Sequence, residues 1–181
     1  MKSLYESILD NEDVLIDNAK QDIKKFDNPI AYFIYTYINE LENDKNNELN
    51  DKLLDKRLSN DDKLNKRLKT YFDFDKGKFT WETRIYKHGN NITANFNIRD
   101  HTNNRVIYIQ YSNDYDGWHK MIKLRMLSPQ HIKNNFPELY QDKYVKNYRK
   151  IVNKIKRDFK DSFLSVEDSA GQFKTFFIPI N

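Results

Sequence analysis

The sequence contains no cysteine and only four glycines among its 181 residues. The absence of cysteine excludes disulfide bonds, thiolate zinc sites, iron–sulfur clusters and cysteine nucleophiles, and it suits a reducing compartment. The glycines do not form a G-x-G-x-x-G or a G-x-x-x-x-G-K-[ST] array, whose backbone amides would cradle phosphates. We therefore expect neither a Rossmann-type nor a Walker-type nucleotide site, and no cofactor.

Long apolar runs are also missing. No run approaches the roughly 20 apolar residues that span a bilayer, and the acidic first 15 residues do not resemble a secretory signal. These features predict a soluble, cytoplasmic protein without a membrane partner. Charged residues make up 32% of the chain and the mean hydropathy is −0.92, values that also occur in disordered proteins. The aromatic content of 14% supplies the large side chains that a core needs, so we expect a folded chain.

Two short amphipathic helices are predicted within residues 1–27. Ser3 and Glu6 have the spacing of a capping box, which marks the start of the first helix. Its apolar stripe is the predicted docking surface for a protein partner and consists of Leu4, Tyr5, Ile8 and Leu9. We expect residues 28–181 to form a single α+β domain behind this segment.

Helical signals continue after residue 27. Asn28 and Pro29 are an N-cap and a first-turn proline, and residues 30–38 are apolar nearly all round, which is typical of a helix buried on both sides. Between residues 44 and 69 the chain is highly charged. Its leucines form only a thin stripe, made of Leu49, Leu53, Leu58, Leu64 and Leu68. This pattern predicts a solvated pair of helices, interrupted at residues 59–60, that forms a charged projecting arm.

The spacing of apolar residues changes from helical to alternating after Lys78. The alternation predicts a hairpin that turns at residues 88–90, followed by strands at 105–111 and 118–127. Together these segments predict a four-stranded antiparallel meander with one polar face. Gly171 precedes the segment 173–180 and Pro179 lies near its end, so we expect this segment to be a C-terminal edge strand.

A long amphipathic helix is predicted over residues 138–162. With a rotation of about 100° per residue its apolar side chains fall on one face and its basic side chains on the other. The residues that we interpret as a nucleic-acid-binding surface are Lys146, Arg149, Lys150, Lys154 and Arg157. The alternative is a solvated face whose positive charge suits the C-terminal half of a helix.

Charge is distributed unevenly along the chain. Residues 1–50 contain five Lys/Arg and eleven Asp/Glu, a net charge of −6, whereas the rest contains 26 and 16, a net charge of +10. A basic surface for nucleic acid is one interpretation. Attraction between the acidic and basic parts of the same chain is the other.

No catalytic or metal-binding group can be assigned from spacing. The four histidines lack the separation of metal ligands, and Glu82 is the only acidic side chain on the predicted strands. Residues 112–117 imitate half of a calcium loop, but Ser112 and Lys123 replace two of its carboxylates. An enzyme site assembled only by the fold, for example from His119, Glu82 and Arg84, is the remaining enzymatic alternative.

The opening Ser3-Leu-Tyr-Glu-Ser-Ile-Leu-Asp10 and the acidic stretch after it resemble the start of uncharacterised proteins of crAss-like and related large gut bacteriophages. The resemblance covers residues 3–17 and brings no catalytic residue with it. It implies a phage origin, with the host cytoplasm or the virion as location, and an N-terminal docking segment. Our leading hypothesis is a non-enzymatic binding or assembly protein that docks through its N-terminal helix. The alternative is a nucleic-acid-binding protein that uses the basic face of the 138–162 helix.

Overall fold

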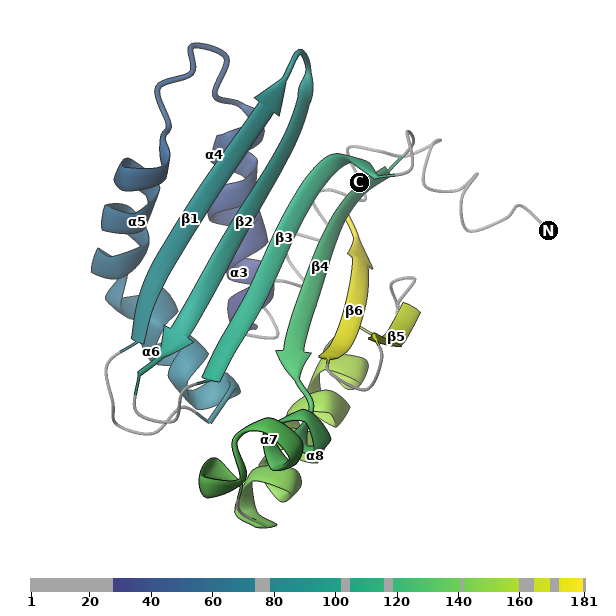
Figure 1. The fold of residues 1–181 in the computed structure, drawn as a ribbon. Helices are drawn as coiled ribbons and strands as arrows, with labels where there is room; N and C mark the ends of the chain where they lie inside the picture. Colours follow the sequence, from purple (N-terminus) through teal and green to yellow (C-terminus); the bar gives the residue numbers. More distant parts are fainter. Residues whose placement is uncertain are drawn as a thin grey trace, which may run out of the picture.

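One antiparallel sheet organises the described part of the molecule. The computed structural model describes residues 28–73, 79–101, 105–115, 119–140, 142–159, 165–169 and 173–180. Within these residues the sheet has six strands in the order β1-β2-β3-β4-β6-β5 (Figure 1). The strands are β1 (Phe79–His88), β2 (Asn91–Asp100), β3 (Arg105–Tyr115), β4 (His119–Leu127), β5 (Ser165–Ser169) and β6 (Phe173–Pro179).

Helices cover one face of the sheet and one of its ends (Figure 1). The first described helix runs without a break through α3 (Pro29–Phe33), a π-helical turn η1 (Ile34–Ile38) and α4 (Asn39–Glu42). The others are α5 (Asp51–Asn60), α6 (Asp62–Tyr71), α7 (Pro129–Asn135), a 3-10 turn η2 (Pro137–Leu139) and α8 (Asp142–Asp158). These elements confirm the α+β class, the antiparallel meander of β1 to β4 and the long basic amphipathic helix.

The core lies between the meander and the helix that starts at Pro29. Asn28 caps this helix as predicted, because its side-chain oxygen accepts from the backbone N–H groups of Ile30 and Ala31 at 2.9 and 3.1 Å. Phe33 stacks on Trp81 with ring centroids 5.7 Å apart and meets Phe96 edge-on at 4.9 Å. The position of this helix behind the strands explains its buried apolar face (Figure 1). The expectation that it is buried on both sides is wrong, because Tyr35 is 38% exposed.

The charged segment between residues 44 and 69 is not a projecting arm. The pair of helices and the break near residues 59–60 are as predicted, but Leu54, Leu58, Leu64 and Leu68 are at most 1% exposed. Leu53, which was placed in the apolar stripe, is instead 38% exposed. Fully burying one leucine stabilises a fold by about 1.5–3 kcal/mol, so a stripe one leucine wide is enough to attach each helix to the core. The charges face the solvent around that stripe.

The C-terminal strand is not at the edge of the sheet. β6 pairs with β4 on one side and with β5 on the other, which makes β5 the edge strand. The sequence of β5, Ser-Val-Glu-Asp-Ser, has a single apolar residue and therefore lacks the alternation that predicts a strand. Pairing with the exposed backbone of β6 supplies the hydrogen bonds that hold it.

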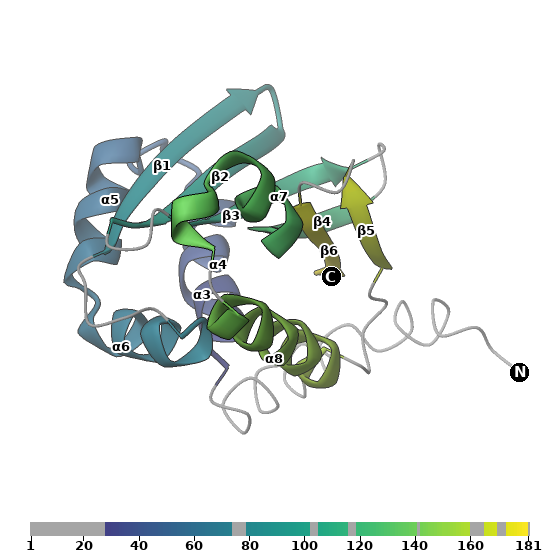
Figure 2. The same cartoon turned by 60° about the horizontal axis from the view of Figure 1, so that its bottom comes forward.

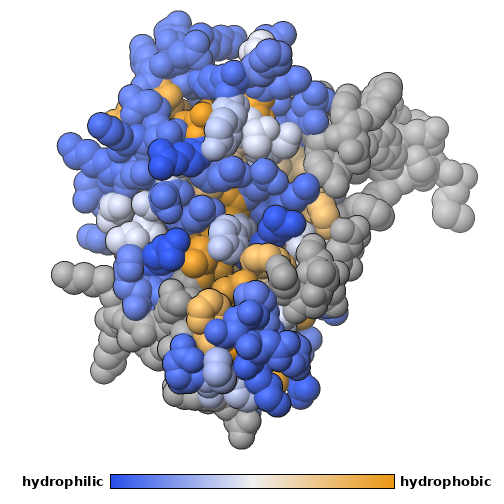
Figure 3. Space-filling view, viewed as in Figure 1, coloured by the Kyte–Doolittle hydropathy of each residue, from blue (hydrophilic) through white to orange (hydrophobic). Residues whose placement is uncertain are grey.

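The face of the sheet turned away from α3 and α4 is mostly hydrophilic over β1 and β2 (Figure 3). Burial alternates along these strands, so that Thr80, Arg84 and Arg99 face outward while Trp81 and Phe96 face the core. The predicted polar face of the meander is thereby confirmed over β1 and β2, whereas on β3 and β4 the same face includes the buried Val106 and Met121. None of the described helices is long and apolar enough to cross a membrane.

Candidate nucleic-acid interface

The last helix, α8, is attached to the molecule by one face only. Ile151, Val152 and Ile155 are 6%, 8% and 0% exposed and join the hydrophobic core. The helix runs past the ends of α3 and α6, with α7 above it (Figure 2). Its sequence contains seven Lys/Arg and two Asp, and most of the basic side chains fall on the side away from the core.

A partly buried carboxylate fixes the C-terminal end of α8. Asp158 Oδ2 accepts from Asn28 Nδ2 at 2.9 Å and from the Tyr71 hydroxyl at 3.0 Å, which ties α8 to the start of α3 and the end of α6. Burial, together with the negative charge of Asp158, raises the pKa of Tyr71, so this hydroxyl stays protonated and donates. Nearer the start of α8, Asn147 donates to the Asp73 carboxylate. The helix is therefore held at both ends.

The structure divides the five predicted nucleic-acid-binding residues into two groups. Lys146, Arg149, Lys150 and Arg157 are exposed. Lys154 is half-buried: its Nζ donates to the Tyr71 carbonyl at 3.2 Å and lies 4.8 Å from the centroid of the Tyr71 ring. It helps to attach α8 to α6, in addition to contributing charge at the margin of the basic face.

We define the basic face of α8 by its exposed cations, Lys146, Arg149, Lys150, Lys156 and Arg157. Elsewhere in the described structure cations meet acids, as in the pairs Arg57–Glu40, Lys87–Asp44 and Lys120–Glu42. On the basic face, Arg157 donates from Nε to Asp158 Oδ1 at 3.2 Å. The other four have no described acid within ion-pair distance. No described acid therefore neutralises their charge.

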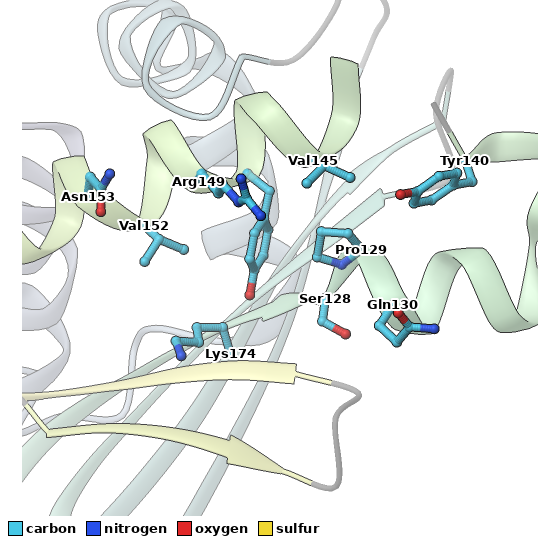
Figure 4. A pocket seen from close by; sticks show the side chains of 10 residues that line it. Ser128, Pro129, Gln130, Tyr140, Val145, Arg149, Val152, Asn153 and Lys174 are labelled. Carbon is cyan, nitrogen blue, oxygen red and sulfur yellow. The ribbon is translucent and has the colours of Figure 1, made fainter. Parts of the chain in front are cut away.

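Three hollows border α8. One of about 580 Å³ lies between α8, the start of α7 and β6 (Figure 4). A second of about 470 Å³ lies on the outer side of α8, and a third of about 420 Å³ lies between α6 and α8. No acidic side chain is among the described residues that line them. The eight basic ones are Lys63, Lys66, Arg67, Lys146, Arg149, Lys150, Lys154 and Lys174.

The largest hollow brings together side chains from distant parts of the sequence. α8 contributes Val145, Arg149 and Val152 to its lining, and the start of α7 contributes Ser128 and Pro129 on the opposite side (Figure 4). Lys174 enters from β6 and Tyr140 closes one end (Figure 4). Tyr140 is held in place by Lys133, whose Nζ lies 5.5 Å from the centroid of its ring.

The other predicted sites do not line these hollows. Leu4, Tyr5, Ile8 and Leu9, the predicted docking residues, lie outside the described residues. Glu82 and Arg84 lie 3.9 Å apart on the outward face of β1, and neither lines any of the three hollows. The side chain of His119 is not among those that the structure describes.

The described residues do not form a metal-binding site. His101 Nε2 lies 2.8 Å from the Thr80 hydroxyl, and His131 contacts the side chain of Asn135 one helical turn later. Within the described ranges no three His, Asp or Glu side chains are placed to hold a metal ion. In the calcium-like segment, residues 116–118 lie outside the described residues, whereas Ser112 lies on β3 and Lys123 on β4.

Sequence reasoning missed the contribution of α6 and of Tyr140. Lys63, Lys66 and Arg67 follow the spacing of one helical face, which was a usable signal, but their segment was interpreted as a separate arm. No pattern along the chain links Tyr140 or Lys174 to α8. Only the fold brings them to the same hollow.

Comparison with known proteins identifies no relative of this chain. No family model, curated protein or solved structure matches the chain. An α+β architecture alone does not specify a function, because one architecture hosts many unrelated activities. Function is therefore inferred from the chemistry of the basic face and the hollows beside it.

Proposed function

We propose that this protein is a non-enzymatic binder of nucleic acid and that the phosphates lie along the basic face of α8. The observation that carries the proposal is the segregation of charge. Three hollows border one helix, and their described lining contains eight Lys/Arg and no Asp/Glu. A chain with 27 acidic residues has placed none of them there among the described positions.

The length of the basic face suits a phosphate backbone. Lys146 and Arg157 are eleven residues apart, which corresponds to about 16 Å along a helix that rises 1.5 Å per residue. One strand of a duplex carries about five phosphates over that length, at roughly 3.4 Å per phosphate. Five exposed cations therefore face about five phosphates.

Four of these cations, all except Arg157, have no described acid within ion-pair distance, and this supports the same conclusion. A solvated face that served only solubility would mix both signs of charge, as α5 does with its three Lys/Arg and two Asp. Attraction to the acids that the structure describes would appear as ion pairs. Among described residues, ion pairs hold Arg57, Lys87 and Lys120 to acids, yet none holds Lys146, Arg149 or Lys150.

A salt titration tests the proposal. If four cations of the basic face each displace a counterion, the logarithm of the association constant falls with the logarithm of salt with a slope of about −2.8 for a single strand and −3.6 for a duplex. Raising the salt fourfold from 50 mM should then weaken binding about 50- to 150-fold. Fluorescence anisotropy with labelled oligonucleotides measures both quantities. Binding that is absent at low salt, or that does not respond to salt, contradicts the proposal.

Charge reversal locates the site. Lys146→Glu combined with Lys150→Glu removes two phosphate contacts and should lower the salt slope by about 1.4 to 1.8. The matched control is Lys52→Glu with Lys56→Glu, an exposed pair of lysines with the same spacing on α5, which lies at the other edge of the sheet (Figure 1). Equal losses in both variants would show that binding follows net charge and not the basic face.

Docking of a protein partner through Leu4, Tyr5, Ile8 and Leu9 stays a prediction, as does the phage origin. Both concern a segment outside the described residues. A cytoplasmic location likewise stays an expectation from composition. None of these is needed for the nucleic-acid proposal, which depends only on described side chains.

A further inference from the structure

We infer that the substrate of the basic face is a single strand, and that one unstacked base enters the 580 Å³ hollow beside Tyr140. The inference rests on the proposed function and names the form of nucleic acid that the same site takes. Two hollows lie along the middle of α8, between Val145 and Asn153. One faces outward and the other faces α7 and β6.

The two hollows share a wall. Tyr140, Val145, Arg149 and Asn153 line both of them. On the outer side the lining continues with Lys146 and Lys150, which are suited to phosphates. A strand that lies on these lysines therefore passes directly beside the entrance of the inner hollow, with Arg149 between the backbone and the base.

The inner hollow has the mixed chemistry that a nucleobase needs. A base has flat faces that stack on rings and a polar edge that forms hydrogen bonds. Tyr140, Tyr148 and Pro129 supply flat surfaces, and Val145 and Val152 supply apolar contacts. The polar groups that remain include Arg149 and the exposed amide of Asn153. Its volume of about 580 Å³ lies within the range of ligand pockets, roughly 300–1,000 Å³.

These features favour a single strand over a duplex. A base inside a duplex is stacked and paired, and reaching a pocket would require its extrusion from the helix. A base in a single strand is already free to stack on an aromatic side chain or on an arginine plane. An acidic peptide would use the lysines in the same way, but it could place a flat ring in the hollow only through an aromatic side chain.

Three probes of equal length separate these cases with the full chain: a single-stranded oligodeoxynucleotide, its duplex, and an abasic strand that keeps the phosphates. The wild type should bind the single strand at least about fivefold more tightly than the abasic strand. Tyr140→Ala should reduce that difference, although Tyr148 still lines the hollow, and Tyr140→Phe should keep it because the ring remains. Tyr86→Ala, which removes a tyrosine 58% exposed on β1, is the matched control and should bind like the wild type.

This experiment distinguishes failure of the base pocket from failure of the phosphate site. Equal, salt-dependent binding of all three probes would overturn the base pocket and leave the phosphate site standing. Equal weakening of single and abasic strands by Tyr140→Ala would also overturn it, because the ring would then act only on the shape of α8. Failure to bind any probe at low salt would overturn both. Tighter binding of an acidic peptide than of any strand would assign the basic face to a protein partner.

Discussion

Replacing Asp158 with alanine should loosen the attachment of α8 and destabilise the fold by about 2–3 kcal/mol. The Asp158 carboxylate accepts from Asn28 at 2.9 Å and from Tyr71 at 3.0 Å, and hydrogen bonds to a charged group contribute about 1.5–3 kcal/mol each. We take less than their sum for two reasons. The side chain of Asp158 is 12% exposed, so water can replace part of its role, and Asn28 keeps a 3.3 Å bond to the Tyr71 hydroxyl.

Urea unfolding monitored by circular dichroism measures this effect. With a slope of about 2 kcal/mol per molar urea, the midpoint should fall by about 1–1.5 M. Tyr71→Phe removes one partner and should have a smaller effect, about 1–2 kcal/mol. The double variant should lose less than the sum of the two, because both changes remove the same hydrogen bond. Asp114→Ala removes an exposed carboxylate and should change stability by less than about 0.5 kcal/mol.

Two results would refute this reasoning. A midpoint for Asp158→Ala equal to that of the wild type would mean that α8 is held by its apolar face alone. Strict additivity in the double variant would mean that Tyr71 and Asp158 act separately, in conflict with the contact between them and with the raised pKa of the Tyr71 hydroxyl, which follows from burial and from the nearby carboxylate.

Two further predictions concern the segment between residues 44 and 69. Leu58→Ala should lower the free energy of unfolding by about 2.7–5 kcal/mol in thermal or urea unfolding, because Leu58 is 0% exposed. Leu53→Ala should have little effect, because Leu53 is 38% exposed. Equal losses in the two variants would contradict the packing described and support a projecting arm. Asp55→Asn should stabilise the protein at neutral pH. Burial raises the pKa of Asp55, and its Oδ1 is buried without a hydrogen-bond partner. The folded state therefore binds a proton more tightly than the unfolded state, so stability should fall as the pH rises from the ordinary pKa of aspartate through the raised one. The variant should lack this fall, and an unchanged pH profile would contradict the assignment.

The strands were predictable where one face is buried and the other is wet. In β1 and β2 this alternation is nearly complete, and a shift by one residue would place Trp81 and Phe96 in solvent. β5 could not be predicted, because its order comes from the backbone of β6 and not from its own side chains. The burial of Leu54 and Leu64 could not be predicted from the sequence either. A narrow apolar stripe has the same residue spacing on a solvated helix as on a helix packed beside a sheet.

Part of the candidate site, the basic side of α8, was predictable from the spacing of residues along the helix. A rotation of 100° per residue separates the apolar and basic sides of α8, so the exposure of Lys146, Arg149 and Lys150 followed from the sequence. The different role of Lys154 did not, because it lies at the margin of the basic side and its partner Tyr71 belongs to another helix. Tyr140 carries no local signal, and its position beside Arg149 is a product of the fold.

The neighbouring positive charges of the basic face repel one another and destabilise α8. Lys146 and Lys150 are one helical turn apart, as are Lys146 and Arg149, and like charges at such spacings destabilise a helix by about 0.2–0.5 kcal/mol per pair. A single glutamate on this side of α8 would relieve that repulsion. Instead, Asp158 turns toward Asn28 and Tyr71, where it holds the helix in place. Among the described residues no acid compensates this repulsion, and our proposal accounts for it because a bound polyanion would neutralise the charge.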